Sequence, residues 1–565
     1  MAETAETRAD RERRYLELGY WRDELLHRAV LGDCAVRGDR TALVEGARRI
    51  GYRELGERVE RAAAGFGALG LRPGDRVAVR LGNTIGMVCA FLGLVRGGMV
   101  PVLMPPGLGT REVDHVVRTT GARALLSRDA GSGSETAALV GHLREHHPGV
   151  LVCLAAEGGR ARRRTPPEGV LALDEVLTSE RSEGSEGIRD AAQAPPPAAR
   201  DSSDVAFFLL SGGSTGLPKA IPRTHRDYIC NLEVSARLTA LGPDSIYLAA
   251  LPAAHNFVLG CPGVLGTLAA GGTVVLGSPA LGRVRRDIGN ERVTVTALVP
   301  GLARLLPEHG ADLSTLQVLQ VGGARLYEPD ARRLIDALPG RLQQVFGMAE
   351  GLLNFTRLDD PDDVVAGTQG RPASPADEWF LADAAGAPVP AGQEGELLVR
   401  GPYTIGAYLA PDEVNRASFT ADGFYRTGDI VRVHESGNFV VVGRRKDFVN
   451  RGGEKVSASE LEEVLAGCPA LAASAVVPVA DDLHGEAVCV AAVAAEGARV
   501  DLHTVRDFLG ARGIARYKLP EHLVLFERLP VTAVGKADRA VLAEQAQARV
   551  RAAARPSPDD GPTDH

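Results

Sequence analysis

A Gly- and Ser-rich segment that ends in a lysine follows an apolar stretch, residues 205–210, which is predicted to be a buried strand. The segment reads Ser211-Gly212-Gly213-Ser214-Thr215-Gly216-Leu217-Pro218-Lys219. Glycines let backbone N–H groups turn toward an anion, hydroxyls add donors, and a lysine adds a positive charge. These residue types favour polyphosphate binding over the alternative, a flexible surface loop. The segment is not a Walker A motif, because Leu217 and Pro218 interrupt the spacing that this motif requires.

Composition excludes several other classes of function. The 565 residues carry 64 Lys and Arg against 72 Asp and Glu, a net charge of −8, which gives no electrostatic footprint for nucleic acid or anionic lipid. Seven scattered cysteines without a CxxC pair support neither a disulfide framework nor a zinc site. Residues 256–282 have no charged side chain, but their prolines and glycines favour a buried helix followed by a strand over a membrane span. We therefore expect a soluble, cytoplasmic protein.

Helix and strand patterns alternate through most of the chain. A helix is predicted over residues 55–69, a strand over 76–80, a buried helix over 83–95 and a strand over 100–103. This alternation is typical of the α/β class, with helices around parallel sheets. Residues 157–203 turn to Gly, Arg, Pro, Ser and Glu and are interpreted as an insertion or linker without chemistry.

Beyond residue 390 the pattern changes to short strands, at 396–400, 430–433 and 439–442, which predict a β-rich subdomain. Ser457 and Glu460 then form a capping-box pattern that begins a helix. The predicted organisation is a large N-terminal core over residues 1–442, a charged bridge at 443–447, a small α+β C-terminal domain over 448–545 and a disordered tail at 546–565.

Four further motifs follow the Gly- and Ser-rich segment in order: Phe346-Gly347-Met348-Ala349-Glu350, Tyr425-Arg426-Thr427-Gly428-Asp429, Gly443-Arg444-Arg445-Lys446-Asp447 and Pro530-Val531-Thr532-Ala533-Val534-Gly535-Lys536. With that segment they resemble the motifs of the adenylate-forming enzymes, which include acyl- and aryl-CoA ligases, luciferases and the adenylation domains of peptide synthetases. The resemblance runs from about residue 20 to 545. Five motifs in one order are highly specific, whereas each alone would be weak.

The resemblance implies ATP and Mg²⁺ as cofactors. In the family a substrate carboxylate attacks the α-phosphorus of ATP, so positioning and charge neutralisation carry the chemistry. The candidate catalytic residues are Lys219, His255 and Lys536. The candidate nucleotide-binding residues are Ser211, Gly212, Gly213, Ser214, Thr215, Gly216, Gly322, Gly323, Val345, Phe346, Gly347, Glu350, Asp429 and Arg444. Glu350 is implied as the Mg²⁺ ligand, Asp429 as the acceptor for the ribose hydroxyls, and Lys446 and Asp447 as hinge residues.

The candidate acid pocket is formed by Asn256, Phe257, Cys261 and Leu353. Amino-acid-activating relatives commonly have Asp where Asn256 stands, and a neutral Asn would leave a substrate ammonium unpaired, so an amine-free acid is favoured. The pocket motif resembles the stand-alone aryl-acid ligases of siderophore synthesis, in which Cys at the position of Cys261 is typical of salicylate enzymes. A thiol would satisfy a second catechol hydroxyl poorly, at a cost of roughly 1–3 kcal/mol. 2,3-Dihydroxybenzoate and 3-hydroxypicolinate remain alternatives to salicylate.

The expected acyl acceptor is the phosphopantetheine thiol of a separate carrier protein, since the chain shows no carrier segment of its own. The family resemblance implies that the bridge at 443–447 is a hinge and that the small C-terminal domain is a mobile lid, which rotates about the hinge between the two half-reactions. Coenzyme A is the alternative acceptor, which would make the protein an aryl-CoA ligase. A catalytically silent adenylate-binding protein is the alternative from a different class.

Overall fold

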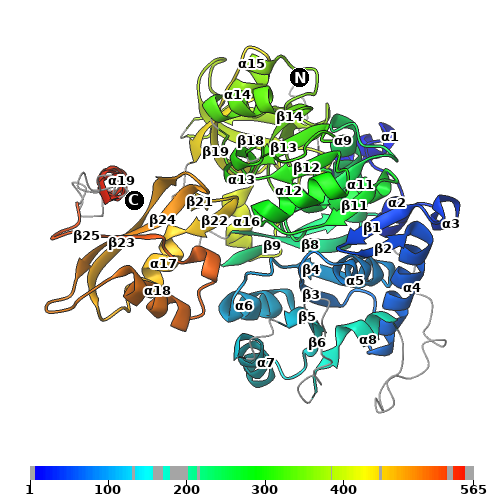
Figure 1. The fold of residues 1–565 in the computed structure, drawn as a ribbon, viewed down its shortest axis with the longest axis horizontal. Coiled ribbons are helices and arrows are strands. Elements are labelled where there is room, and N and C mark those ends of the chain that lie inside the picture. The colour runs from blue at the N-terminus through cyan, green and yellow to red at the C-terminus, as the bar shows by residue number, and fades with distance from the viewer. Residues whose placement is uncertain are drawn as a thin grey trace, which may run out of the picture. The chain divides into compact units, whose positions relative to one another are not determined.

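In the computed structural model the chain divides into two units, one of Met1–Ser211 and Lys219–Arg445 and one of Gly212–Pro218 and Lys446–His565. The structure describes residues 7–129, 134–156, 169–178, 201–212, 217–308, 310–326, 328–383, 385–444, 448–530 and 539–553. The prediction of an α/β fold with a large N-terminal and a smaller C-terminal domain is confirmed (Figure 1). The hinge and the rotation of the smaller domain stay predictions.

A seven-stranded sheet leads to the Gly- and Ser-rich segment. Its strands, in spatial order, are β7 (Leu171–Ala172), β6 (Leu151–Ala156), β5 (Ala124–Asp129), β3 (Arg76–Arg80), β4 (Val100–Leu103), β8 (Val205–Gly212) and β9 (Pro218–Thr224). The pairs from β7 to β8 are parallel. Since β4 and β5 lie on opposite sides of β3, right-handed connections put α5 (Ile85–Arg96) and α6 (Thr110–Thr120) on opposite faces of the sheet.

The helices of this sheet follow from their apolar patterns. α5 is buried at ten of its twelve positions because it packs between the sheet and α4 (Tyr52–Ala68). α7 (Ser134–His146) lies against α6. The predicted helices at 55–69 and 83–95 and the strands at 76–80 and 100–103 are confirmed.

The predicted insertion or linker 157–203 contains ordered structure at residues 169–178. They form β7 and α8 (Leu173–Thr178), and α8 packs against α4 with Leu173, Val176 and Leu177 buried. The approach is close, because a Cβ on Gly65 of α4 would lie 2.1 Å from the Val176 carbonyl oxygen. The surrounding Gly, Pro and Ser residues obscured a short i, i+3, i+4 apolar pattern.

The nine-stranded sheet carries most of the candidate site. Its order is β16 (Arg371–Pro372), β15 (Leu353–Phe355), β14 (Arg341–Gly347), β13 (Val318–Gly322), β12 (Val295–Leu298), β10 (Ile246–Ala249), β11 (Thr273–Leu276), β1 (Thr41–Glu45) and β2 (Arg48–Gly51). The strands from β14 to β1 are parallel, and β2, β15 and β16 are antiparallel edges.

Helices cover this sheet along its length, and Figure 1 shows α11 and α12 in front of it. They are α9 (His225–Leu238), α10 (Asn256–Gly260), α11 (Gly263–Ala269), α12 (Leu281–Asn290), α13 (Pro300–Leu305), α14 (Glu328–Ala337) and α15 (Asp362–Gly367). The uncharged segment 256–282 becomes two short buried helices, α10 and α11, followed by β11. Among the described residues, no helix is long and apolar enough to cross a membrane.

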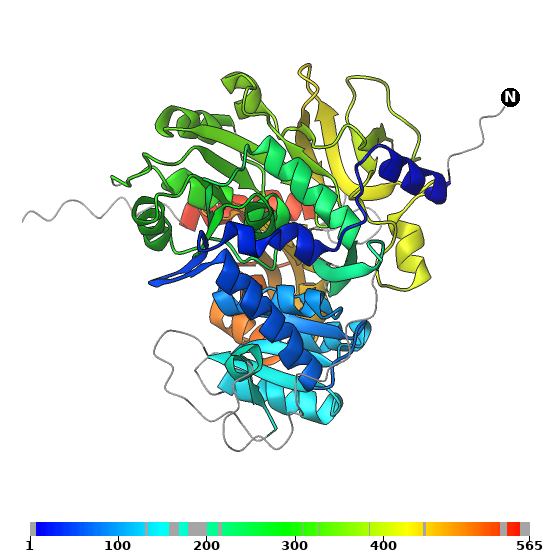
Figure 2. The ribbon, with the colours of Figure 1, turned by 90° about the vertical axis from the view of Figure 1, so that its right-hand side faces the viewer.

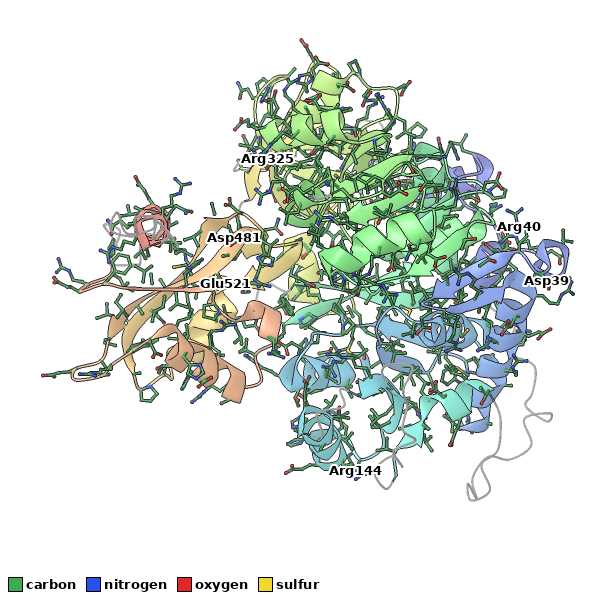
Figure 3. All side chains as sticks on the ribbon, viewed as in Figure 1. Asp39, Arg40, Arg144, Arg325, Asp481 and Glu521 are labelled. Carbon is green, nitrogen blue, oxygen red and sulfur yellow. The ribbon has the colours of Figure 1, made fainter. Side chains whose placement is uncertain are left out.

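Three short helices and an exposed turn precede or adjoin the sheets. α1 (Arg8–Glu17) lies beside the β-rich subdomain, where Arg14 pairs with Glu378 at 2.9 Å (Figure 2). α2 (Leu26–Leu31) packs on α9 and α11, and α3 (Cys34–Arg37) packs on α4. The charged side chains of Asp39, Arg40 and Arg144 are exposed at the outside of the first unit (Figure 3).

The predicted β-rich subdomain is an antiparallel sheet of β17 (Glu378–Ala382), β18 (Gly395–Arg400), β19 (Tyr425–Val433) and β20 (Phe439–Arg444). α16 (Asp412–Ser418) precedes β19. The β19–β20 hairpin turns at residues 434–438.

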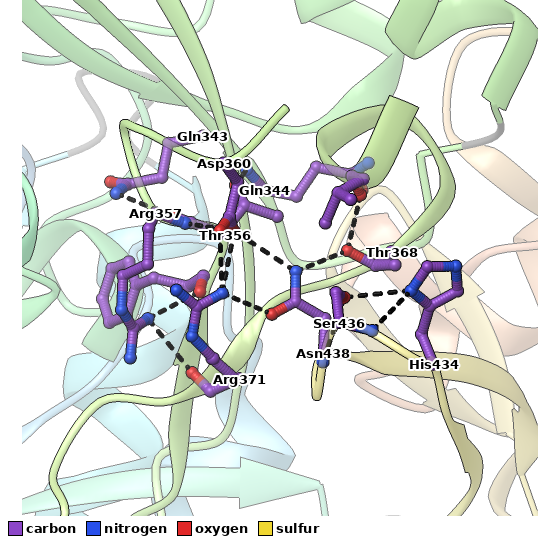
Figure 4. A network of polar contacts seen from close by, with 12 residues as sticks. Gln343, Gln344, Thr356, Arg357, Asp360, Thr368, Arg371, His434, Ser436 and Asn438 are labelled. Carbon is purple, nitrogen blue, oxygen red and sulfur yellow. Dashed lines mark hydrogen bonds and ion pairs between the residues drawn. The ribbon is translucent and has the colours of Figure 1, made fainter. Parts of the chain in front are cut away.

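Buried polar contacts join this hairpin to the edge of the nine-stranded sheet (Figure 4). Asn438 is fully buried, and its amide donates to Thr368 Oγ1 at 2.9 Å and accepts from Arg371 at 2.8 Å. Arg371 also pairs with Asp360 at 2.9 Å. Because every partner is a directional donor or acceptor, the hairpin is held in one register against the sheet.

The C-terminal unit is an α+β structure of its own. β22 (Glu454–Ser457), β21 (Phe448–Arg451), β24 (Gly485–Ala494) and β23 (Leu471–Asp481) form a sheet, and β25 (His522–Leu525) pairs in parallel with β24. α17 (Ala458–Leu465) begins at the predicted cap, where Ser457 Oγ accepts from the Glu460 N–H at 3.3 Å. α18 (Leu502–Ala511) packs against α17.

The last helix corrects the predicted disordered tail at 546–565. α19 (Arg539–Ala553) extends eight residues into it, so the prediction was wrong for residues 546–553. Leu542, Ala546 and Val550 recur at i, i+4, i+8 spacing and pack against β23 and β24. Burial of this apolar face stabilises the helix. Residues 554–565 lie outside the described part.

The Glu460 side chain forms a buried ion pair with Lys518, at 2.9 Å, and both residues are at most 2% exposed. We expect Glu460→Ala to lower the free energy of unfolding by about 3–5 kcal/mol, because a buried ammonium loses its counter-charge. Urea unfolding of the full-length protein measures this. The control Asp507→Ala breaks an exposed pair with His503 at 3.2 Å and should cost less than about 0.5 kcal/mol. Equal losses in the two variants would contradict the expectation.

Candidate functional site

The Gly- and Ser-rich segment connects β8 to β9. Ser211 and Gly212 end β8, and Lys219 stands near the start of β9. Gly213, Ser214, Thr215 and Gly216 lie outside the described residues. The Lys219 ammonium lies 4.7 Å from the ring centroid of Tyr408, within the range of a cation–π contact. The lysine is thereby held at a defined place beside the end of the strand.

Tyr408 brings three of the predicted motifs together. Its hydroxyl donates to Glu350 Oε1 at 2.7 Å and lies 3.0 Å from the hydroxyl of Tyr425. Glu350 is 3% exposed, and its backbone carbonyl accepts from the Ile405 N–H at 2.8 Å. Burial and the neighbouring Glu350 carboxylate hold the pKa of Tyr408 far above its usual range. The phenol is therefore a permanent neutral donor to Glu350.

Sequence reasoning missed Tyr408, because the segment 401–410 matches no motif. An isolated tyrosine gives no signal of its role in one sequence. Backbone pairing explains its place, since the Leu409 N–H donates to the Ala220 carbonyl at 3.0 Å and ties this segment to β9, next to Lys219.

Asp429 and Arg444 are paired residues of the β19–β20 hairpin. Asp429 is 3% exposed, and its N–H donates to Thr427 Oγ1 at 3.0 Å. Gly428 before it has a φ of +73°, a conformation that favours glycine. The side chain of Arg444 and the residues Lys446, Asp447 and Lys536 lie outside the described part of the chain.

Gly322 ends β13 beside the candidate acid pocket, and Gly323 follows it. A Cβ on Gly322 would lie 2.6 Å from the Val345 carbonyl oxygen and 3.1 Å from Phe257 Cζ, so glycine makes room for the phenyl ring. Gly323 has a φ of +83°. The chain can therefore turn away at this edge of the sheet.

The segment Val345, Phe346 and Gly347 joins the nucleotide side of the site to the acid side. These residues end β14 and pair with Phe355, Asn354 and Leu353 of β15, respectively. A shift of the Phe346–Glu350 motif would therefore also move Leu353.

The four residues of the candidate acid pocket lie close together. Phe257, Cys261 and Leu353 belong to one apolar cluster together with Val345. Asn256 begins α10 and is 8% exposed; its Oδ1 accepts from the Tyr228 hydroxyl at 2.9 Å, and its Nδ2 donates to Cys261 Sγ at 3.4 Å. Burial raises the pKa of the Cys261 thiol to about 12, so it is neutral. The polar groups of this pocket are uncharged.

His255 precedes Asn256 as the residue before α10 and is partly buried. The loop that leads to it is fixed by Asn83, whose Nδ2 donates to the Ala249 and Leu251 carbonyls at 2.8 Å and whose Oδ1 accepts from the Ala253 N–H at 2.8 Å. Sequence reasoning missed Asn83, because its role depends on a loop about 170 residues away.

Arg223 is a third residue whose role the sequence did not reveal. It is fully buried, and its guanidinium donates to Asp227 Oδ1 at 2.9 Å, to the Ala349 carbonyl at 3.0 Å and to the Tyr403 carbonyl at 3.1 Å. Its guanidinium carbon lies 4.7 Å from the Tyr228 ring centroid. Arg223 thus joins β9 to the residue before Glu350 and to the segment that carries Tyr408.

These features agree with the comparisons to known proteins. The profile of AMP-binding enzymes matches residues 32–409, about two thirds of the chain, and that of the AMP-binding enzyme C-terminal domain matches residues 460–536. The chain belongs to the AMP-binding enzyme family. In this family the first profile covers β8, Glu350 and Tyr408, and the second covers α17 to Lys536.

Several relatives match nearly the whole chain. A Salicylyl-CoA synthase / salicylate adenylyltransferase of Streptomyces sp is 44% identical, over 93% of this chain and 94% of the relative. A Salicyl-AMP ligase / salicyl-S-ArCP synthetase of Mycobacterium tuberculosis is 42% identical (95% and 93%), and a 2,3-dihydroxybenzoate-AMP ligase of Bacillus subtilis is 42% identical (94% and 95%). The apo structure of MbtA from Mycobacterium smegmatis matches with a TM-score of 0.70 and 42% identity, over 95% of this chain and 98% of that chain.

Among the described residues, no group of three or more His, Cys, Asp or Glu could hold a metal ion. Glu350 is a single buried carboxylate, and Mg²⁺ in nucleotide sites takes one or two carboxylates with phosphate oxygens supplying further ligands. The chemistry of this donor therefore fits a magnesium ion that arrives with a nucleotide.

A buried carboxyl behind the acid pocket predicts a pH dependence of stability. Asp377 Oδ1 is buried without a hydrogen-bond partner in the described part, and Oδ2 accepts from the Tyr403 hydroxyl and the Ser374 N–H. Burial raises the pKa of Asp377 from 3.8 to about 7. The folded protein therefore holds a proton that the unfolded chain has lost between these pH values, so stability falls as the pH rises from about 4 to 7.

We expect the thermal unfolding midpoint of Asp377→Asn to fall less steeply than that of the wild type between pH 5 and 7.5. The control Asp383→Asn changes an exposed loop carboxylate and should keep the wild-type slope. Calorimetry across this range is the measurement, and parallel profiles for the wild type and Asp377→Asn would rule out the titration.

Proposed function

We propose that this AMP-binding enzyme activates an aryl carboxylic acid, salicylate, with ATP and then transfers the aryl group to the phosphopantetheine thiol of a separate carrier protein. The product would enter siderophore or aryl-capped peptide biosynthesis. One observation carries the choice of acid: the polar groups of the pocket are the carboxamide of Asn256 and the neutral thiol of Cys261. A substrate ammonium would be buried there without a counter-charge, at a cost of several kcal/mol.

The nucleotide would bind along the ends of β8, β13 and β14. Lys219 supplies a positive charge at the end of β8, and the backbone N–H groups of the Gly- and Ser-rich segment supply donors to phosphate oxygens. Asp429, buried on β19, is the acceptor for the ribose hydroxyls. Glu350 would hold Mg²⁺, which would neutralise phosphate charge when bound. Tyr408 keeps the Glu350 carboxylate oriented through its hydrogen bond.

In the first half-reaction a carboxylate oxygen of the acid attacks the α-phosphorus of ATP. A bond forms between this oxygen and the phosphorus, the bond from the phosphorus to the β-phosphate oxygen breaks, and pyrophosphate leaves. Both reactants are negatively charged, so Lys219 and Lys536 act by neutralising charge that builds up between them. His255 is the N-cap residue of α10, directly before Asn256, and would position the carboxylate of the acid.

The identity of the aryl acid rests on Cys261. Salicylate has one hydroxyl, whereas 2,3-dihydroxybenzoate has a second, which would meet an apolar thiol that is a weak hydrogen-bond partner. The Streptomyces relative is named a salicylate adenylyltransferase and the Mycobacterium relative a salicyl-AMP ligase, which supports this choice. The Bacillus relative has the same sequence identity to the chain as the Mycobacterium relative, 42%. Its name refers to 2,3-dihydroxybenzoate, which supports that acid as the second candidate.

A carrier protein is the acceptor that we favour, since the Mycobacterium relative is named a salicyl-S-ArCP synthetase. The name of the Streptomyces relative supports coenzyme A as the alternative. In both cases a thiolate sulfur would attack the acyl carbon of the aryl-AMP, and AMP would leave.

The decisive experiment is ATP–pyrophosphate exchange with salicylate, 2,3-dihydroxybenzoate, benzoate, 3-hydroxypicolinate and mixed amino acids offered separately. We expect exchange that depends on salicylate. Lys536→Ala should lower it by at least about a hundredfold, because charge neutralisation in the transition state is lost. Absence of exchange with every acid would favour a catalytically silent adenylate-binding protein. Unchanged exchange in Lys536→Ala would remove that lysine from the mechanism.

We expect Cys261→Ser to raise the kcat/KM ratio of 2,3-dihydroxybenzoate to salicylate by about ten- to a hundredfold, because a hydroxyl satisfies the second catechol hydroxyl where a thiol does not. Exchange kinetics with both acids give the ratio. The control Cys230→Ser changes another buried thiol of the same apolar cluster and should leave the ratio within about threefold of the wild type. The same ratio in wild type and Cys261→Ser would exclude Cys261 from acid selection.

A further inference from the structure

The Tyr228 side chain lies behind the candidate acid pocket, and its hydroxyl contacts the pocket residue Asn256. Tyr228 is fully buried on α9, and its ring packs edge-on against Phe207, with ring centroids 4.7 Å apart. The Arg223 guanidinium lies over the same ring. The hydroxyl donates a hydrogen bond to Asn256, whose Oδ1 lies 2.9 Å away. Ring packing fixes the hydroxyl, so this oxygen is a rigid partner for the carboxamide.

We propose that Tyr228 is a specificity-determining residue, because its hydroxyl orients the Asn256 carboxamide with the amino group toward the acid and so selects aryl acids with a hydrogen-bond acceptor beside the carboxylate. The proposal rests on the proposed aryl-acid activation. It adds a residue that the sequence motifs did not single out, and it states the chemical class of substituent that the pocket takes.

Two orientations of the carboxamide are conceivable, and the donor inventory distinguishes them. With Oδ1 toward Tyr228, the phenol donates its proton and Nδ2 donates to Cys261 Sγ at 3.4 Å. In the reverse orientation the phenol would accept from Nδ2, and its own proton would have no acceptor, because Asn256 Oδ1 is its one acceptor among the described residues. An unsatisfied buried donor is expensive, so the first orientation is favoured.

Cys261 cannot reverse this preference. A thiol is a weak donor and a weak acceptor, so it binds either end of the carboxamide about equally well. The phenol is a strong donor, and burial holds its pKa well above the usual range, so it stays protonated at physiological pH. The Tyr228 phenol therefore determines the orientation of the Asn256 carboxamide, and the Cys261 thiol can bind it in either orientation.

One amino hydrogen of Asn256 remains for the substrate. In salicylate the phenolic hydrogen can donate internally to the carboxylate, which leaves the phenolic oxygen as an acceptor for Asn256 Nδ2. In 2-aminobenzoate one N–H donates internally, and the second N–H would meet the Asn256 amino group, donor against donor. These two acids have nearly the same shape, so the orientation of Asn256 would separate them.

The first test uses the wild-type protein and needs no variant. ATP–pyrophosphate exchange with salicylate, benzoate and 2-aminobenzoate should give a kcat/KM for salicylate at least about tenfold above that for 2-aminobenzoate. Equal or better exchange with 2-aminobenzoate would overturn the proposal. Exchange with none of the three acids would instead refute the proposed function itself.

The second test is Tyr228→Phe, which removes one oxygen atom and keeps the ring. Without its donor the carboxamide can turn, so we expect the salicylate to 2-aminobenzoate ratio to fall by about five- to fiftyfold. The ratio of salicylate to benzoate should fall as well, whereas KM for ATP should stay within about twofold. An unchanged acid ratio, with exchange intact, would overturn the role of Tyr228 and leave the proposed function standing.

The chain offers a matched control in Tyr247. It is also fully buried, lies on β10, and has a hydroxyl without a hydrogen-bond partner in the described part. Tyr247→Phe should leave the acid ratio at the wild-type value. Thermal unfolding of both variants shows whether a change in the acid ratio comes from a loss of folding. A Tyr228→Phe protein that unfolds near the wild-type temperature but keeps the wild-type ratio of salicylate to 2-aminobenzoate contradicts the proposal. If this variant does not fold, exchange of the wild-type protein with the three acids decides the proposal.

Discussion

The buried guanidinium of Arg223 makes three hydrogen bonds to segments that are far apart in the chain, and the geometry of the site depends on them. One goes to Asp227 on α9, one to the carbonyl of Ala349 and one to the carbonyl of Tyr403. If these segments moved apart, the buried guanidinium would lose its counter-charge and its acceptors, which would lower the stability of the fold by about 3–5 kcal/mol. The three segments are therefore held together. Together they position Glu350, one residue after Ala349, and Tyr408, five residues after Tyr403.

The same framework serves the acid pocket. Tyr228 follows Asp227 on α9, and its hydroxyl binds Asn256, so the helix that Arg223 holds also orients the pocket. On the other side of the pocket, Leu353 pairs through the backbone with Gly347 of the Phe346–Glu350 motif. The carboxylate of an acid and the α-phosphate of a nucleotide would therefore be held by parts that move together, which is what an in-line attack requires.

The two halves of the proposed site differ in electrostatic character, and this difference suits the proposed reaction. The nucleotide half contains a lysine and two buried carboxylates, which suit phosphate oxygens, a metal ion and ribose hydroxyls. The acid half contains a carboxamide, a phenol and a thiol, all uncharged. With these uncharged groups around it, the substrate carboxylate would be the main charge in the acid half. Selection among acids would then depend mainly on which groups donate and which accept hydrogen bonds.

From the sequence alone, the fold class and the family motifs could be predicted. Apolar periodicity predicted α4, α5, β3 and β4, because this signal is local. The resemblance to the adenylate-forming enzymes named Asn256 and Cys261 as pocket residues, and the structure places their side chains in contact. The tertiary structure alone decided the roles of Arg223, Tyr228 and Tyr408, since each acts through partners tens or hundreds of residues away. It also decided that α8 and the end of α19 are ordered, because their few apolar residues gain stability only from the surfaces that bury them.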